Sequence, residues 1–324
     1  MIERLLETHW GLHPPLQLEP LSTGFNNASW FVTSGDGEYV LKRSLNIDAG
    51  SRVGFEHALL RALAQANLPF AVPAPVPTKT GEMRADVPEG GAFSLTHRIP
   101  GKPGWRGDPT LARRAGHALA ILDRALATVE LPTGPQVPEA YPSLDVSDAR
   151  IARGLDVDRV LAREIGEILG RAERQLASTT TGWPTQVIHT DFFPTNVLVD
   201  HGTVAGVIDF EFAGSGHLAM DFAIGLVAFG TNRGEFVPHV DLMEAFAAGY
   251  LGTASLSPGE LAAIPHLILM REAGSFAHWF GRMESGLATR DDLRERGQRL
   301  LDLDRWLSAN RDDLVAQLGR VIRS

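Results

Sequence analysis

A short polar loop between two strand-like runs constrains this chain more than any other feature. The runs 187–188 and 197–199 are rich in Val, Ile and Leu, and they flank the sequence His-Thr-Asp-Phe-Phe-Pro-Thr-Asn. Asp191 and Asn196 stand five residues apart in this loop, and Asp209 ends the next strand-like run. Carboxylate and amide oxygens, together with phosphate oxygens, are the ligands that Mg²⁺ prefers. The pattern therefore predicts chemistry on a phosphoryl group, for which a separate carboxylate must accept the proton of the attacking hydroxyl.

Charge and composition exclude several classes of protein. The 324 residues include 30 Lys and Arg against 39 Asp and Glu, a formal net charge of −9. This balance argues against a general nucleic-acid binder and is compatible with a cationic small substrate. The absence of Cys excludes disulfides, thiolate nucleophiles and Cys-ligated metal centres. The longest apolar run, 222–230, is too short to span a membrane, so we expect a cytoplasmic protein without a membrane partner.

The two ends of the chain differ in their expected secondary structure. Short strand-like runs come first, with one helix among them: strands at 16–21, 29–34, 38–43 and 92–99, and a helix at about 51–66. Helices dominate later: 111–129, one within 147–178, and several from 217 to the end, interrupted only by strand-like runs at 187–188, 197–199 and 204–210. We therefore expect an α+β protein with a small antiparallel-sheet N-terminal lobe, 1–98, carrying one main helix. The larger C-terminal lobe, 99–324, is expected to be mostly helical.

The polar loop resembles that of a known group of enzymes. H-x-D-x-x-x-x-N followed by a D-F-x triplet is the pattern of protein-kinase-like phosphotransferases. His-Thr-Asp without an intervening Arg, and Asp-Phe-Glu as the triplet, are similar to the aminoglycoside phosphotransferase branch. The resemblance implies a bilobal protein-kinase-like fold that uses ATP and Mg²⁺. It also implies that Asp191 is the catalytic base, and that Asn196 and Asp209 are Mg²⁺ ligands. His189 is expected to organise the loop.

A strand-borne lysine and a helix-borne glutamate precede this loop. Lys42 ends the strand-like run 38–42, and Glu56 follows fourteen residues later on the expected helix. The resemblance implies that Lys42 contacts the α- and β-phosphates of ATP and that Glu56 pairs with it. Taken singly, each could be a solvated surface charge. Their order and spacing together favour the nucleotide-binding interpretation.

Two further segments complete the expected nucleotide site. Gly24, Asn26 and Asn27 belong to a run of small and polar residues that can present backbone N–H groups to phosphates. This run resembles the G-x-x-N loop of homoserine-kinase-like members of the family, although a plain hairpin turn has a similar composition. Thr96 and His97 precede a Pro-Gly turn. They fit the family's hinge between lobes, where the backbone would bond the edge of adenine.

Other interpretations of these segments have less support. The sequence G-x-G-x-x-A at 214–219 could indicate dinucleotide binding, but no βαβ unit continues around it. Asp221 matches an Asp that braces the catalytic loop in the family, and an Asp at a helix N-terminus is a comparable alternative. A non-catalytic pseudokinase would usually have lost the base, the metal ligand or the lysine. This chain retains Asp191, Asp209 and Lys42.

The C-terminal half carries a weaker signal for the phosphate acceptor. A Gly-Tyr pair before the helix start at 256–261 resembles the layout of homoserine kinases in this superfamily, although Ser257 and Glu260 also make a capping box on physical grounds. Further on, three basic residues are expected on roughly one face of a helix: Arg271, His278 and Arg282. An arginine there could bind an acceptor carboxylate bidentately, and a solvated helix face is the alternative.

These observations together predict an ATP- and Mg²⁺-dependent phosphotransferase. We expect it to move the γ-phosphoryl group of ATP to a hydroxyl of a small molecule. Homoserine or a similar amino alcohol is the first expected acceptor, and an aminoglycoside is the alternative. We expect no nucleic-acid partner, and a monomer or a homodimer.

Overall fold

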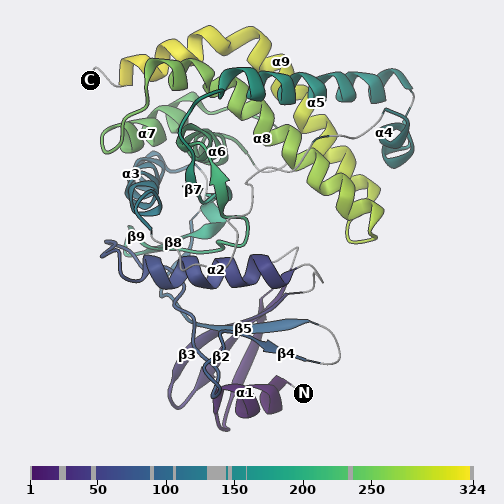
Figure 1. The fold of residues 1–324 in the computed structure, drawn as a ribbon. Coiled ribbons are helices and arrows are strands. Elements are labelled where there is room, and N and C mark those ends of the chain that lie inside the picture. Colours follow the sequence, from purple (N-terminus) through teal and green to yellow (C-terminus); the bar gives the residue numbers. More distant parts are fainter. Residues whose placement is uncertain are drawn as a thin grey trace. The chain divides into compact units, whose positions relative to one another are not determined.

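The chain folds into two compact units. The computed structural model describes residues 2–21, 27–44, 49–87, 91–104, 107–129, 144, 148–157, 159–232 and 236–321 (Figure 1). Unit 1 comprises Met1–Lys102, Thr128–Pro138 and Leu198–Glu211. Unit 2 comprises Pro103–Ala127, Glu139–Val197 and Phe212–Ser324. The sequence-based ranges 1–98 and 99–324 had placed the segment that ends at Glu211 in the second lobe, whereas the structure groups it with the first.

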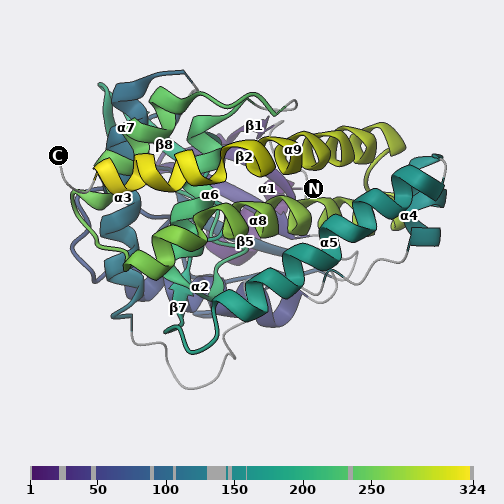
Figure 2. The same cartoon turned by 90° about the horizontal axis from the view of Figure 1, so that it is seen from above.

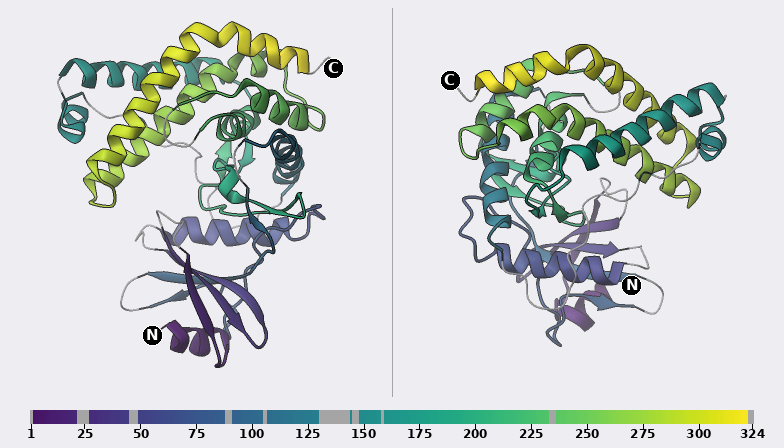
Figure 3. Two further views of the ribbon diagram at one scale, coloured as in Figure 1. Left: turned by 180° about the vertical axis from the view of Figure 1, so that it is seen from behind. Right: turned by 45° about the horizontal axis from the view of Figure 1, so that its top comes forward.

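Unit 1 is built on a five-stranded antiparallel sheet. Its strands, in the order β1-β2-β3-β5-β4, are β1 (Gln17–Leu21), β2 (Asn27–Ser34), β3 (Gly37–Ser44), β5 (Ala92–His97) and β4 (Ala85–Asp86). The helix α1 (Ile2–Trp10) packs on this sheet (Figure 3). Alternate residues of the strands face α1 because successive side chains of a strand point to opposite faces. The resulting core joins Leu6 of α1 to Val32, Leu41 and Leu95.

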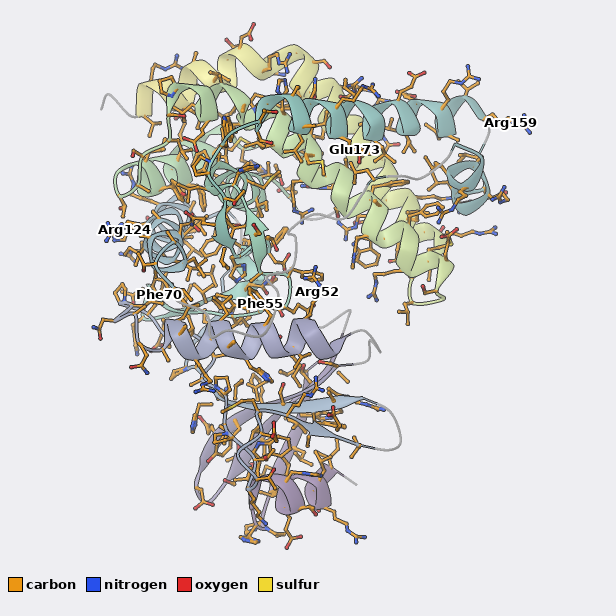
Figure 4. The ribbon with its side chains drawn as sticks, viewed as in Figure 1. Arg52, Phe55, Phe70, Arg124, Arg159 and Glu173 are labelled. Atoms are coloured by element: carbon orange, nitrogen blue, oxygen red, sulfur yellow. The ribbon has the colours of Figure 1, made fainter. Side chains whose placement is uncertain are left out.

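The second helix of unit 1, α2 (Ala49–Leu63), carries the apolar stripe expected from the sequence. Phe55, Leu59 and Leu63 recur every four residues and are all buried (Phe55 is labelled in Figure 4). Burying such a stripe is the main stabilising contribution of an amphipathic helix in a folded protein. The helix also carries Glu56, so the packing of the stripe fixes the position of this carboxylate.

A hairpin later in the sequence completes unit 1. β8 (Val197–Asp200) and β9 (Thr203–Val207) are joined by a tight turn, and with β6 (Lys102–Pro103) they form a sheet in the order β6-β8-β9. Backbone hydrogen bonds tie the hairpin to Ala71, which donates to Ala205 at 2.9 Å and accepts from Val207 at 3.0 Å. The strand is shorter than the predicted run 204–210. It ends before Asp209, whose φ of +67° is incompatible with extended backbone.

Unit 2 is mostly helical, with one small two-stranded antiparallel sheet. Its elements are α3 (Pro109–Leu126), α4 (Asp148–Leu155), α5 (Arg159–Thr179), β7 (Gln186–Ile188), the 3₁₀ turn Pro194–Asn196, β10 (Gly214–Gly216), α6 (Leu218–Gly230), α7 (Val240–Leu251), α8 (Pro258–Glu284) and α9 (Arg290–Val321). α6 is buried along almost its whole length and packs against α3, α7 and α8 (Figure 2). None of the helices in the described ranges has the length and apolarity to span a bilayer.

Three local predictions from the sequence of unit 2 can be compared with the structure. The single helix expected within 147–178 is two helices, because Asp156 has a φ of +56° and ends α4. The capping box at the start of α8 is confirmed, with Ser257 and Glu260 bonding each other's backbone N–H groups. The G-x-G segment 214–216 is the strand β10, paired with β7 rather than exposed as a phosphate-binding loop.

Two glycines bring α3 and α7 into backbone contact. A Cβ at Gly116 would lie 2.1 Å from the Phe246 carbonyl oxygen, and one at Gly249 would lie 1.9 Å from that of Arg113. Any side chain at either position would therefore force the helices apart. This close approach fixes Tyr250, the residue after the second glycine, relative to α3.

Candidate active site

A half-buried lysine of unit 1 is surrounded by carboxylates. Lys42 lies on β3, and its Nζ is 3.7 Å from Glu56 Oε1, 3.3 Å from Asp209 Oδ1 and 2.9 Å from Glu211 Oε2. The pair with Glu56 is the one expected from the sequence. Asp209 and Glu211 reach the lysine because the loop after β9 follows the left-handed backbone at Asp209.

The charges of this cluster shift one another's pKa values. Burial lowers the pKa of Lys42, but Glu56, Asp209 and Glu211 together raise it well above its usual value. Burial raises the pKa of Glu56 to about 7, against the attraction of Lys42. Burial likewise raises the pKa of Asp209, and Lys42 opposes the shift. Three carboxylates facing one ammonium leave a surplus of negative charge, which suits a divalent cation.

A buried histidine next to this cluster makes stability depend on pH. Burial, with the nearby charges of Lys42 and Arg84, lowers the pKa of His57 to about 4. An unfolded chain has a His pKa near 6.5, so the stability that neutral His57 contributes is present above that pH and is lost as the pH falls toward 4. We expect His57 to account for about 2 kcal/mol of the unfolding free energy lost between pH 7 and 5.

Urea unfolding of the wild-type protein and of His57→Phe at both pH values measures this contribution. The raised pKa of Glu56 acts in the opposite sense, because its stabilising effect is lost as the pH rises through about 7. The contribution of Glu56 is present in both proteins, so it cancels when their unfolding free energies are compared at each pH. Equal losses of stability in both proteins on acidification would show that His57 is not the responsible group.

Only some of the other residues predicted for the nucleotide site in unit 1 lie in the described part of the chain. Gly24 and Asn26 lie outside the described residues, and Asn27 opens β2 without a described side chain. Thr96 and His97, the predicted hinge residues, end β5. The His97 N–H, however, donates to the Ala74 carbonyl at 3.0 Å, so this group is already engaged. Any bond from the hinge to adenine would have to use other backbone groups.

The polar loop of unit 2 holds Asp191 by its backbone and its carboxylate. Asn196 Nδ2 donates to the Asp191 carbonyl oxygen at 2.9 Å and to Oδ2 of the same residue at 2.8 Å. The 3₁₀ turn that starts at Pro194 sets this geometry, with the Asn196 N–H bonded to the Phe193 carbonyl at 2.8 Å. Both side-chain bonds of Asn196 use its nitrogen. Its amide oxygen therefore remains able to bind a cation.

A buried carboxylate braces the start of this loop. Asp221, in the first turn of α6, accepts the N–H of His189 at 2.5 Å and that of Thr190 at 2.7 Å. Thr190 has a φ of +66°, which a β-branched residue adopts only under strain of about 1–3 kcal/mol. Its hydroxyl also donates to the Phe212 carbonyl at 2.8 Å. His189 is fully buried, and its Nδ1 accepts the Asp191 N–H at 3.2 Å, in accord with an organising role.

Two of the three basic residues predicted for the acceptor side lie beside this loop. The Arg271 guanidinium lies 5.0 Å from the centre of the Phe193 ring, and the His278 ring meets that of Phe212 edge-on at 5.7 Å. Arg282 is directed elsewhere, because it donates to the Leu287 carbonyl at 3.1 Å. All three residues lie on the continuous helix α8, and the contacts described for Arg271 and His278 are those near the polar loop.

Comparison of the sequence with known proteins identifies the family of this chain. The sequence model of the phosphotransferase enzyme family, APH, matches residues 17–263. The chain belongs to this family. The homoserine kinase of Phenylobacterium zucineum is 28% identical over 315 residues, covering 94% of this chain and 91% of that protein. The homoserine kinase of Neisseria meningitidis serogroup B is 28% identical and covers 83% of each chain.

Solved structures show the same fold at lower identity. A microcompartment-associated aminopropanol kinase has a TM-score of 0.76 at 19% identity, covering 95% of this phosphotransferase and 98% of that chain. An amicoumacin kinase in complex with AMP-PNP and Ca²⁺ has a TM-score of 0.72 at 16% identity, covering 93% and 92%. The predicted α+β, protein-kinase-like fold and the predicted membership of the APH phosphotransferases are thus confirmed.

Three polar arrangements of this phosphotransferase were not predicted from its sequence. One is the pairing of Glu211 with Lys42, for which the acidic third residue of Asp-Phe-Glu was the available signal. Another joins Glu272 of α8 to Arg299 of α9 at 3.0 Å, both buried. Burial raises the pKa of Glu272, but Arg299 and then Arg271 lower it below its usual value. The third is a pair of buried carboxyl groups, Asp123 and Asp221, next to the polar loop.

Proposed function

We propose that this phosphotransferase moves the γ-phosphoryl group of ATP to a hydroxyl of a small molecule, with Asp191 as the catalytic base. The proposal rests on the two hydrogen bonds that Asn196 Nδ2 donates to Asp191, to Oδ2 at 2.8 Å and to the backbone carbonyl at 2.9 Å. A carboxylate fixed in this way can orient an attacking hydroxyl and accept its proton. The presence of Lys42 and Asp209 as well favours this activity over a non-catalytic scaffold.

Asn196 and Asp209 fit the requirements of Mg²⁺ ligands. Each offers a side-chain oxygen, and no group of three or more His, Cys, Asp or Glu that could hold a metal by itself occurs among the described residues. Such a pair of protein ligands is typical of Mg²⁺, which completes its coordination with phosphate oxygens and water. When bound, Mg²⁺ neutralises charge on the phosphate oxygens. Lys42, positioned by Glu56, would bind the α- and β-phosphates of ATP.

We infer that the acceptor is homoserine or a similar amino alcohol. The relatives named above support this acceptor, as does the charge next to the catalytic loop. Glu272 is flanked by three arginines, Arg271, Arg296 and Arg299. Glu295 faces one of them, Arg296, so the described charges of this group still leave a small positive surplus. An acceptor carboxylate suits such a surplus. A polycationic aminoglycoside, the alternative acceptor, would be repelled by it.

Arg271 is expected to bind the acceptor carboxylate, because it lies against Phe193, two residues after the base. Arg271→Gln should raise the KM for homoserine about 10- to 100-fold, the loss of a charged bidentate hydrogen bond. The compound 3-aminopropan-1-ol is homoserine without its carboxylate and should be affected less than about threefold. Steady-state kinetics with both acceptors tests this, with Arg305→Gln, on exposed α9 surface, as the control. Equal losses for both acceptors would contradict it.

An acceptor panel tests the proposed function as a whole. The purified protein is incubated with Mg²⁺ and γ-labelled ATP and with homoserine, 3-aminopropan-1-ol, choline, ethanolamine, methylthioribose, several aminoglycosides or a protein substrate. We expect label on homoserine or a related amino alcohol, lost in Asp191→Ala. Transfer to an aminoglycoside alone would establish the alternative acceptor. Binding of ATP without transfer to any compound of the panel would favour the scaffold.

A further inference from the structure

Two buried carboxyl groups meet behind the catalytic loop. Asp221 of α6 and Asp123 of α3 are both almost completely inaccessible to solvent, and each carboxyl group shifts the pKa of the other. An ionised carboxylate only accepts hydrogen bonds, so a bond between two carboxyl groups requires a proton on one of them. In the low-dielectric interior, two adjacent carboxylates also cannot both keep their charge.

The hydrogen-bond donors around the pair show which oxygen atoms need this proton. Asp221 accepts two backbone N–H groups, from His189 and Thr190, and lies in the first turn of α6. Both features stabilise a negative charge. Among the described residues, the carboxyl group of Asp123 accepts only the Tyr250 hydroxyl, at 2.7 Å on Oδ2. No N–H or O–H from another described residue reaches its buried Oδ1.

The pKa shifts of Asp123 and Asp221 also place the proton on Asp123. Burial, and then repulsion by Asp221, raise the pKa of Asp123 well above its usual range. Burial also raises the pKa of Asp221, to about 6, but the two backbone N–H groups oppose the rise. A proton shared by the pair therefore belongs to Asp123, and the charge belongs to Asp221.

We propose that Asp123 is protonated at neutral pH and donates its hydrogen bond to Asp221, and that Asp123 and Tyr250 are positioning residues for the catalytic base. Asp221 accepts the N–H of Thr190, whose strained backbone directly precedes Asp191, so the position of Asp221 affects that of Asp191. The position of Asp123 depends in turn on Tyr250, which the close packing of α3 on α7 places against it. The proposal rests on the proposed role of Asp191.

Three variants separate positioning from simple packing. Asp123→Asn keeps a neutral N–H donor facing Asp221, so its kcat should stay within about threefold of the wild-type value. Asp123→Leu keeps a similar volume without a donor, and its kcat should fall about 10- to 100-fold with an ATP KM changed less than about twofold. Tyr250→Phe should lower kcat about 3- to 10-fold. A wild-type kcat in Asp123→Leu would overturn the positioning role.

An infrared measurement tests the proton itself without any assay of activity. The difference spectrum between the wild-type protein and Asp123→Asn at about pH 8 should contain the C=O stretch of a protonated carboxylic acid, sensitive to exchange into D₂O. The other carboxyl groups cancel in this difference. Absence of the band would overturn the proposal even if Asp191 proves to be the base. A band in a protein that transfers no phosphate would instead leave the buried pair established and refute the function of Asp191.

Discussion

Replacing Asp191 by Asn is expected to abolish phosphoryl transfer while leaving ATP binding largely intact. The carboxamide has nearly the shape of the carboxylate but cannot accept a proton, so the attacking hydroxyl loses its base. We expect kcat to fall about 10³-fold and the Kd for ATP to change less than about threefold. Product formation measured with labelled ATP, and calorimetric titration with ATP and Mg²⁺, give the two quantities.

A matched substitution on the surface controls for the change of charge. Asp200 ends β8, just before the turn to β9, with its side chain half exposed. Asp200→Asn should leave kcat within about twofold of the wild-type value. If Asp191→Asn and Asp200→Asn turned over equally fast, Asp191 would not be the base, and the proposed mechanism would fail at its first step.

Removing the buried arginine of α9 is expected to destabilise the protein more than any other single change considered. Arg299 donates to Glu272 at 3.0 Å, to the Thr231 hydroxyl at 3.0 Å and to the Asn232 carbonyl at 3.0 Å. Its side chain and that of Glu272 are 7% and 8% exposed. Arg299→Met leaves the carboxylate of Glu272 buried without its main partner, which costs about 3–5 kcal/mol of unfolding free energy.

Two comparisons make this prediction specific to the buried pair. Arg305→Met, on the same helix, removes an arginine that is 62% exposed and pairs with Asp302, and should cost less than about 1 kcal/mol. The double variant Arg299→Met/Glu272→Leu removes both charges, so it should be more stable than the sum of the single changes predicts. Urea unfolding followed by circular dichroism gives all these values. Strictly additive losses would show that the two charges do not interact.

The sequence was sufficient for the features that depend on local periodicity. The four-residue recurrence of Phe55, Leu59 and Leu63 identified the buried face of α2, and the strand–loop–strand pattern identified the loop that holds Asp191. Both signals arise because a helix or a strand repeats its orientation at fixed intervals. The spacing of Lys42 and Glu56 likewise led to a pair that the structure contains.

Features set by long-range packing or by a single backbone angle were not predictable in this way. The left-handed conformation of Asp209 ended β9 early and brought Glu211 to Lys42, and no periodic pattern signals such a residue. The bond between Asp123 and Tyr250 joins positions 127 residues apart. It depends on the close approach of α3 and α7 at Gly116 and Gly249, which only the folded chain reveals.

Phosphorus NMR of a single reaction mixture tests the central claim most directly. The protein is mixed with ATP, Mg²⁺ and homoserine, and the phosphorus signals are followed with time. We expect the γ-phosphate signal of ATP to be replaced by equal amounts of ADP and a phosphate monoester, with little inorganic phosphate. Release of inorganic phosphate without a phosphate monoester, or an unchanged ATP spectrum with bound nucleotide, would contradict transfer to the homoserine hydroxyl.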